Sequence, residues 1–158
     1  MFGFIKKKEP KEYNPLSPFG FPSSPHPLRG WTNFGMFEVH GMNPDTGREN
    51  KKIVEALTSS HAREQAASMG LAEPISVKEI QRPMATDRQI AYGESLGINI
   101  TTDMSMIDAS ALICRVDDGE TFRDRISKED WFAACRAGVI ISALSGPKNY
   151  ESSMKGHR

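Results

Sequence analysis

Residues 85–98 give the clearest structural indication in the sequence. Thr86 can cap the amino end of a helix, and the Gln89 side chain can return a hydrogen bond to the Thr86 backbone, which makes a capping box. Gly97 lies where a helix-ending glycine belongs, and Ile98 can make the apolar contact that accompanies such an ending. The pattern predicts a short helix whose two ends are both set by local chemistry.

A second helix is predicted directly after it. The Ser105 side chain can cap this helix, with Asp108 in its first turn, so that the two helices form a helix–loop–helix unit. The inner side of the second helix is expected to carry four apolar residues: Ala109, Leu112, Ile113 and Val116.

The same arrangement of a cap and a terminal glycine occurs twice more. Ser59 or Ser60 precedes Gly70, and Ser127 precedes Gly138. For the first copy we favour the simpler explanation, an ordinary helix of three turns. The second copy continues past its glycine into residues like those after Gly97, so the helical half is interpreted as a helix–loop repeat or as two ordinary helices.

Differences in composition divide the chain into four segments. Residues 1–34 contain six of the ten prolines, which prevents helices and central strands. They are predicted to be an extended or disordered proline-rich arm that binds a groove or lies along the protein's own surface. Residues 35–82 are predicted to be a β-β-α-β module, residues 84–146 a helical module, and residues 147–158 a polar tail. The expected fold class is therefore α+β, with a small antiparallel sheet and a helical carboxy-terminal half.

The β-β-α-β prediction depends on alternating apolar residues on both sides of one turn. In residues 43–47, Pro44 presets φ and Gly47 accepts a positive φ, which indicates a turn between two strands. Residues 45–47 also spell the aspartic-protease triplet, but that enzyme needs its carboxylate buried between apolar strands, so the turn is preferred. The helix that follows is expected to place four residues on its inner side: Ala62, Ala66, Ala67 and Met69.

Composition describes a globular protein without an overall charge preference. The 158 residues are 38% hydrophobic and 25% charged, and the formal net charge is zero. No stretch is long enough to span a bilayer, and the apolar residues 1–5 precede Lys6–Lys8, the reverse of a signal peptide. A cytoplasmic protein is expected. In that setting Cys114 and Cys135 are expected to be buried free thiols, with a disulfide between them as the alternative.

No catalytic or metal-binding motif is present in the sequence. P-loop, GxSxG and GxGxxG patterns are all missing, and neither cysteine has a CxxC partner. We therefore expect a non-enzymatic protein without a cofactor or a metal. The histidines are scattered along the chain: His26, His40, His61 and His157.

Two parts of the chain resemble known modules. Residues 85–116, with the pattern T-x-x-Q…L-G…A-S-x-L-I, resemble a short SAP-like helical module of bacterial and phage recombination and replication accessory proteins and of uncharacterised small bacterial proteins. That resemblance implies proximity to nucleic acid. The charges of residues 85–116 and the turn after them argue against binding to phosphates, because the acidic residues outnumber the basic ones, Arg88 and Arg115. Residues 35–82 are similar to small β-β-α-β modules with a Thr-Gly-Arg turn in bacterial accessory proteins, which implies no functional residue.

Two partner classes follow from these observations. The first is nucleic acid, which is slightly favoured. The second is a protein, contacted by the proline-rich arm or by the apolar residues 139–144 in an adaptor or regulatory module. The oligomeric state is left open. A nucleic-acid site would combine basic residues with an aromatic platform, namely Arg48, Lys51, Lys52, Arg123, Arg125, Lys128 and Trp131.

Overall fold

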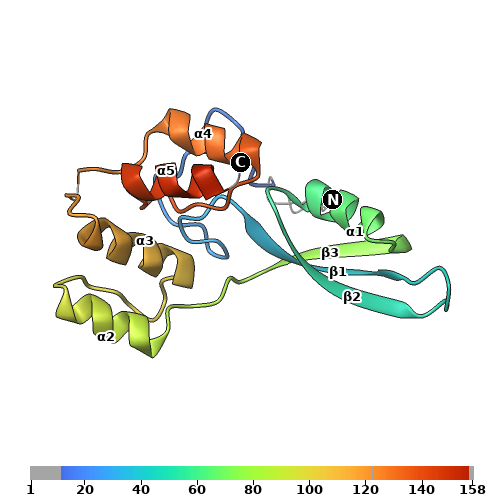
Figure 1. The fold of residues 1–158 in the computed structure, drawn as a ribbon. Helices are drawn as coiled ribbons and strands as arrows, with labels where there is room; N and C mark the ends of the chain where they lie inside the picture. The colour runs from blue at the N-terminus through green and yellow to red at the C-terminus, as the bar shows by residue number, and fades with distance from the viewer. Residues whose placement is uncertain (1–11, 122, 157–158) are drawn as a thin grey trace, which may run out of the picture.

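The α+β prediction is confirmed. The computed structural model describes residues 12–121 and 123–156, and within them the chain forms a three-stranded antiparallel sheet and five helices (Figure 1). In chain order the elements are β1 (Gly35–Met42), β2 (Glu49–Ala56), α1 (Ser59–Ser68), β3 (Ala72–Ile80), α2 (Asp87–Ser95), α3 (Met106–Asp117), α4 (Lys128–Ala137) and α5 (Pro147–Gly156).

The sheet has β1 in its centre, in the order β2-β1-β3, and α1 covers one face (Figure 1). Phe37 of β1 pairs with Val54 of β2, and Val39 of β1 pairs with Val77 of β3. Every second residue of β1 is buried, because successive side chains of a strand point to opposite faces of the sheet. The apolar face of the sheet and α1 form the first hydrophobic cluster: Phe37, Val39, Val54, Ala56, Ala62, Ala66, Leu71 and Ile75.

Helix α1 differs from its prediction at its cap and on its inner side. Thr58, in extended conformation, is the capping residue, and its hydroxyl accepts a hydrogen bond from the His61 amide. The prediction of Ser59 or Ser60 as the cap is therefore wrong. The helix buries Ala62 and Ala66, whereas Ala67 and Met69 are exposed, Met69 by 51%. A single short helix on a narrow sheet buries only a thin strip of its surface, and Ala67 and Met69 lie outside that strip.

The predicted ends of the other helices are confirmed. Thr86 and Gln89 form the capping box of α2, and Ser127 caps α4. Gly138 ends α4 with a left-handed φ of 75°. The Ser105 hydroxyl caps α3 by accepting a hydrogen bond from the Asp108 amide at 3.1 Å. Each of these contacts spans three or four residues, so the sequence pattern is enough to identify it.

The buried face of α3 differs from the apolar face that the sequence predicts. Its fully buried residues include Asp108 and Arg115, along with Ala109 and Ala111. Val116, expected inside, is 41% exposed. Buried polar side chains need hydrogen-bond partners. In this orientation of α3, Asp108 and Arg115 reach the backbone and hydroxyl groups that serve as those partners.

A second hydrophobic cluster surrounds α4. Trp131 of α4 is fully buried at its centre, and Phe21 and Trp31, both from the proline-rich segment, pack against it. Tyr150 and Met154 of α5 contact the same cluster, so residues 147–156 are a packed helix and not the predicted polar tail. The other buried members are Phe34, Leu57, Ile126, Ala134, Cys135, Val139, Ile141 and Ala143.

Three smaller predictions can also be compared with the structure. Residues 43–47 form an exposed turn in which Gly47 has a φ of +68°, as expected. Cys114 and Cys135 are free thiols; Cys135 is buried as expected, whereas Cys114 is only partly buried. In the part of the chain that the structure describes, no helix combines the length and the apolar character that crossing a membrane requires.

Candidate protein-binding surface

The basic residues that the sequence offers for a nucleic-acid site do not gather on one surface. Arg48, Lys51 and Lys52 belong to the β1–β2 hairpin. The turn of this hairpin lies at one end of the molecule, whereas the segment between α3 and α4, which holds Arg123 and Arg125, lies at the other end (Figure 1). A continuous phosphate-binding surface across both groups is therefore not formed in this fold.

Three of the candidates, Trp131, Arg125 and Lys128, contact other groups of the protein itself. Trp131 is 0% exposed, so its ring cannot stack on a base, and the prediction of an aromatic platform at this residue is wrong. The Arg125 guanidinium lies 5.5 Å from the Trp31 ring and donates to the Ala143 carbonyl. The Lys128 ammonium lies 5.9 Å from the ring of Phe132, one helical turn further along. These two cations lie on apolar rings of their own chain.

The apolar segment 139–144, the second candidate for a protein contact, lies mostly in the core. Val139, Ile141 and Ala143 are buried, and of the larger side chains Ile140 is the most exposed, at 37%. The Asn33 side chain donates to the Val139 carbonyl at 2.9 Å and accepts from the Ile141 amide at 2.9 Å. Backbone groups of this segment thus already have partners in the same chain.

Those partners belong to residues 12–34, which we call the N-terminal segment. Its prolines exclude regular structure as expected, and it forms turns and isolated bridges only. It is nevertheless packed into the molecule, because Thr32 and Asn33 are buried to at least 99%. The sequence left open whether the arm binds a groove or lies along the protein's own surface. The described part of the arm lies along the protein's own surface. Residues 1–11 are outside the described residues.

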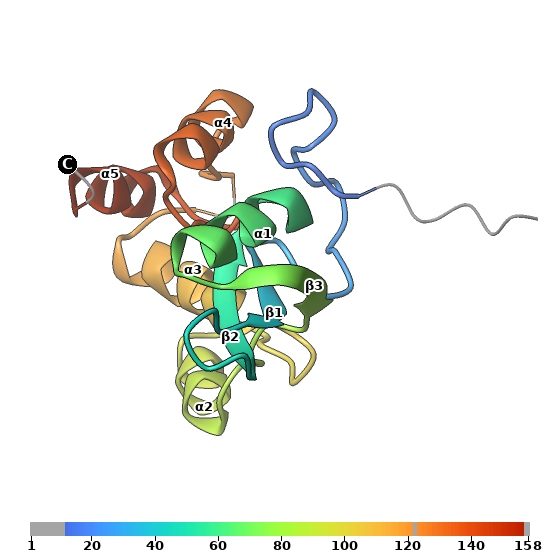
Figure 2. The same cartoon turned by 90° about the vertical axis from the view of Figure 1, so that its right-hand side faces the viewer.

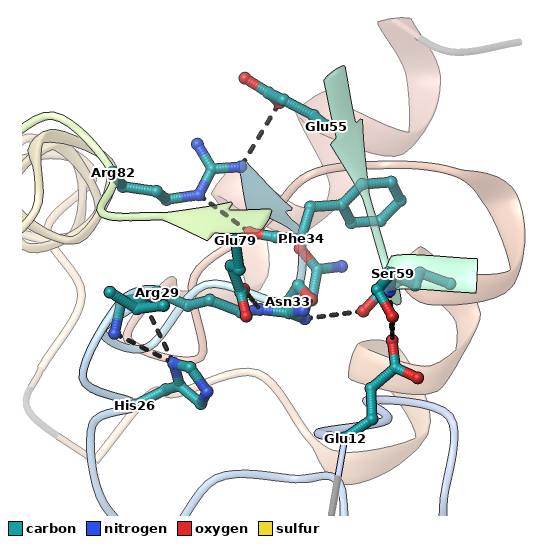
Figure 3. A network of polar contacts seen from close by, with 11 residues as sticks. Glu12, His26, Arg29, Asn33, Phe34, Glu55, Ser59, Glu79 and Arg82 are labelled. Atoms are coloured by element: carbon teal, nitrogen blue, oxygen red, sulfur yellow. Dashed lines mark hydrogen bonds and ion pairs between the residues drawn. The ribbon is translucent and has the colours of Figure 1, made fainter. Parts of the chain in front are cut away.

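Arg29 is the main polar anchor of this segment (Figure 3). Its guanidinium is 1% exposed, forms an ion pair of 2.5 Å with Glu79 of β3, and donates to the carbonyls of Asn33 and Leu57. Gly35 makes room for the pair, since a Cβ at that position would lie 2.2 Å from the Glu79 carboxylate. The buried charge is therefore balanced by a carboxylate and two carbonyls.

Arg82 makes a second buried link at the start of the sheet. Its Nε donates to the Phe34 carbonyl at 2.9 Å, and its Nη2 lies 3.4 Å from the Glu55 carboxylate (Figure 3). The Arg82 amide donates to the Leu28 carbonyl, which lies in the N-terminal segment. The two arginines thus link the N-terminal segment to β2 through Glu55 and to β3 through Glu79.

Asp108 connects the same segment to the helical half. Its buried carboxylate accepts hydrogen bonds from the Trp31 amide at 3.0 Å, the Ser142 hydroxyl at 2.7 Å and the Thr32 hydroxyl at 3.4 Å. Burial raises the pKa of this carboxyl group, and the donors oppose that rise. Gly30 has a φ of 62°, and a Cβ there would lie 2.3 Å from the carboxylate, so the close approach requires glycine.

Residues 13–21 form a loop that is closed by its own hydrogen bonds, and we call it the locked loop. Two consecutive turns are closed by hydrogen bonds from the Ser17 amide to the Asn14 carbonyl and from the Gly20 amide to the Ser17 carbonyl. The Tyr13 hydroxyl donates to the Gly20 carbonyl at 2.5 Å and joins the two ends of the loop. A Cβ at Gly20 would lie 2.6 Å from the carbonyl oxygen of Pro15, so the loop is packed against itself.

The locked loop is also anchored to α4, beside which it projects in Figure 2. The Trp131 indole donates to the Pro15 carbonyl at 3.3 Å, and the Phe21 ring meets the Trp131 ring edge-on at a centroid distance of 5.8 Å. The Tyr13 ring contacts the His26 ring at 5.3 Å and lies under the Arg29 guanidinium. Burial raises the pKa of Tyr13 to about 12, so its hydroxyl stays protonated and continues to donate.

Phe19, at the tip of the locked loop, is 94% exposed. Leaving a phenylalanine side chain in water forgoes roughly 1.5–3 kcal/mol that burial would provide. Leu16 on the same loop is 37% exposed. Single exposed apolar residues are common, but here the exposed ring is held by a loop whose other aromatic residues are all anchored.

A hollow of about 280 Å³ lies beside Phe19. Three aromatic residues line it, Tyr13, Phe19 and Phe21, together with the polar residues Ser23, Ser24 and His26. The His26 Nδ1 accepts hydrogen bonds from the backbone amides of Leu28 and Arg29, which leaves Nε2 as the protonated nitrogen. Burial lowers the pKa of His26, so the lining is uncharged at neutral pH.

The described residues contain no group of three or more His, Cys, Asp or Glu side chains that is arranged to hold a metal ion. No protein-family profile, curated protein or solved structure matches the chain. The resemblance to a SAP-like unit therefore remains a prediction from the sequence.

Sequence reasoning did not identify Phe19 or the locked loop. The pattern that could have indicated it is a pair of turn-forming dipeptides, Asn14-Pro15 and Ser17-Pro18, followed by Gly20. That pattern predicts consecutive tight turns with Phe19 at their tip. It does not predict exposure, because the anchoring residue, Trp131, is far away in the sequence.

Proposed function

We propose that the protein is a non-enzymatic adaptor that binds another protein through the locked loop, with Phe19 as the residue that enters the partner. The observation that carries this proposal is the 94% exposure of Phe19 on a loop held by its own hydrogen bonds and by α4. A loop already held in one conformation loses little entropy on binding. Aromatic anchors of this kind supply much of the affinity in protein interfaces.

The distribution of charge favours a protein over a nucleic acid as the partner. In the part of the chain that the structure describes, no Lys or Arg lines the hollow beside Phe19, and binding to phosphates requires such cations. The hairpin and the α3–α4 segment, which hold the basic candidates, lie at opposite ends of the molecule (Figure 1). Binding to a nucleic acid is therefore the alternative that the following test can detect.

The test places a photo-crosslinking phenylalanine analogue at position 19 in the full chain, within cells of the native host. The control carries the analogue at Tyr92, which is 46% exposed on α2, distant from the locked loop in sequence. We expect a covalent adduct with peptides of one defined protein at position 19 and not at position 92. Nucleotide or lipid adducts, or the same protein adducts at both positions, would overturn the proposal.

A stability measurement accompanies the crosslinking. Phe19→Ala should change the free energy of unfolding by less than about 0.5 kcal/mol, because the removed ring contacts mainly water. The variant should lose the partner while keeping the fold. A large loss of stability would indicate that the ring packs against the chain in solution, which contradicts its role as a free contact.

A further inference from the structure

The hollow beside Phe19 has a chemical character that narrows the class of partner. Three aromatic residues, Tyr13, Phe19 and Phe21, and three prolines belong to its lining. Tyr13 and Phe21 cannot move freely, because one is hydrogen bonded to Gly20 and the other packs on Trp131. The parts of the lining that Tyr13 and Phe21 form are therefore already in place before any ligand binds, whereas the Phe19 ring is 94% exposed.

The polar groups of the lining are neutral and can donate hydrogen bonds. Ser23 and Ser24 carry hydroxyl groups, and His26 carries its proton on Nε2 because Nδ1 accepts from two backbone amides. Among the described residues, 12–121 and 123–156, no carboxylate or cation belongs to the lining. A charged ligand such as a phosphate or a carboxylate would thus be desolvated without a counter-charge, which is costly. The ligand that fits is uncharged, apolar and rich in hydrogen-bond acceptors.

A proline-rich segment in the polyproline II conformation has these properties. Its rings are apolar and pack well on aromatic faces, and its prolines have a carbonyl but no amide hydrogen, so it accepts and does not donate. Its backbone makes no internal hydrogen bonds, which leaves the carbonyls free for donors on a receptor. Aromatic-lined grooves are one of the recurrent ways in which proteins bind such segments.

We infer that the hollow between Phe19 and His26 binds an uncharged proline-rich segment of the partner protein in polyproline II form. Proline rings would lie between Phe19 and the anchored rings of Tyr13 and Phe21, and carbonyls would accept from the donors of the lining. This inference rests on the proposed adaptor function and names the kind of peptide that the adaptor recognises.

The test is a titration of the isotope-labelled full chain with a synthetic decaproline peptide, followed by amide chemical shifts. A glycine–serine peptide of the same length is the matched ligand control. We expect decaproline to shift amides of residues 13–27 and the glycine–serine peptide to leave them unchanged. Phe19→Ala should weaken decaproline binding about tenfold, as loss of an aromatic anchor does, whereas Tyr92→Ala should not change it.

The outcomes separate this inference from the proposed function. Equal responses to the two peptides, or decaproline binding that Phe19→Ala leaves unchanged, would overturn the inference. If that occurred while the crosslinker at position 19 still captured one defined protein, the adaptor function would stand with a different ligand class. If the crosslinker captured no defined protein, the adaptor function itself would be wrong.

Discussion

The β-β-α-β module and the N-terminal segment are both well packed, but different forces stabilise them. The module buries apolar side chains such as Phe37 and Val39 between its sheet and α1. The N-terminal segment has no helix or strand of its own. Its rings of Phe21, Trp31 and Phe34 join the cluster around Trp131, but unlike the module it is also held by buried polar residues: Arg29, Thr32 and Asn33. Its partners are Glu79, Asp108 and backbone groups far away in sequence.

This difference predicts different responses to mutation. An apolar core distributes its stabilisation over many weak contacts and tolerates volume-conserving changes. A buried polar network depends on a few partners, and removal of one leaves the others without a hydrogen bond in a place that water does not reach. Single substitutions in the N-terminal segment should therefore be more destabilising than its lack of regular structure suggests.

The largest effect is expected for Arg29→Ala. The change leaves the Glu79 carboxylate and two carbonyls without their buried donor, so the free energy of unfolding should fall by about 3–5 kcal/mol. Urea denaturation measures the change. The control is Arg63→Ala, which removes an exposed pair with Glu73 and should cost less than about 1 kcal/mol. Equal losses in the two variants would contradict the contrast.

Asp108→Ala should have the next largest effect. It deprives the Trp31 amide and the Ser142 hydroxyl of their acceptor, and we expect a loss of about 2–3 kcal/mol in the free energy of unfolding. Asp117→Ala, at an exposed position of the same helix, should change stability by less than about 0.5 kcal/mol. Chemical denaturation of the two variants measures the difference in the free energy of unfolding. Similar losses in both would mean that the Asp108 carboxylate does not join the N-terminal segment to α3.

Gly30→Ala and Gly47→Ala form a matched pair. Both glycines have a positive φ, 62° and 68°, so each substitution should cost roughly 1–2 kcal/mol from backbone strain. Only Gly30 faces the Asp108 carboxylate, whereas a Cβ at Gly47 meets nothing within 4 Å. Gly30→Ala should therefore lower the thermal midpoint further than Gly47→Ala. A larger drop for the hairpin variant would show that the segment adapts more easily than the packing indicates.

The smallest effects concern two histidines, one from each region. Hydrogen bonds to Glu38 and Glu49 on the open sheet face raise the pKa of His40 above 6.5, whereas burial lowers that of His26 below 6.5. The His40 contribution to stability is thus present below the unfolded pKa and is lost as the pH rises through the folded pKa. For His26 the contribution to stability is present above the unfolded-state pKa and is lost as the pH falls through the folded-state pKa.

Nuclear magnetic resonance titration of the imidazole protons measures both values. Glu38→Gln should lower the pKa of His40 and leave His26 unchanged, because Glu38 provides the largest part of the upward shift. A His26 that titrates above His40 would show that the N-terminal segment is open to water in solution.

The parts of the fold that the sequence predicts well are those with local causes. The capping box of Thr86 and Gln89, the Ser127 cap and the glycine at 138 each involve neighbours within one helical turn. The residue alternation of β1 likewise follows from the period of a strand. The α5 helix was missed because its stability comes from Tyr150 and Met154 packing against α4 and not from any local pattern.

The candidate site was the part least accessible to sequence reasoning. The exposure of Phe19 depends on Trp131 holding Pro15 and Phe21, and these residues come together only in the folded chain. In the same way, only the fold shows that the charged residues chosen as a nucleic-acid site form two groups, on the β1–β2 hairpin and near the start of α4, at opposite ends of the molecule (Figure 1).

The sequence by itself determined the first residues of α2, α3 and α4 and the turn at residues 43–47, because capping and turn chemistry operate over three or four residues. Only the tertiary structure decided which face of α3 is buried, where the proline-rich segment lies, and that Phe19 and not Trp131 meets the solvent. The physical reason is distance along the chain: Asp108 with Thr32, Asn33 with Ile141, and Trp131 with Pro15 are hydrogen-bonded pairs that no local pattern encodes.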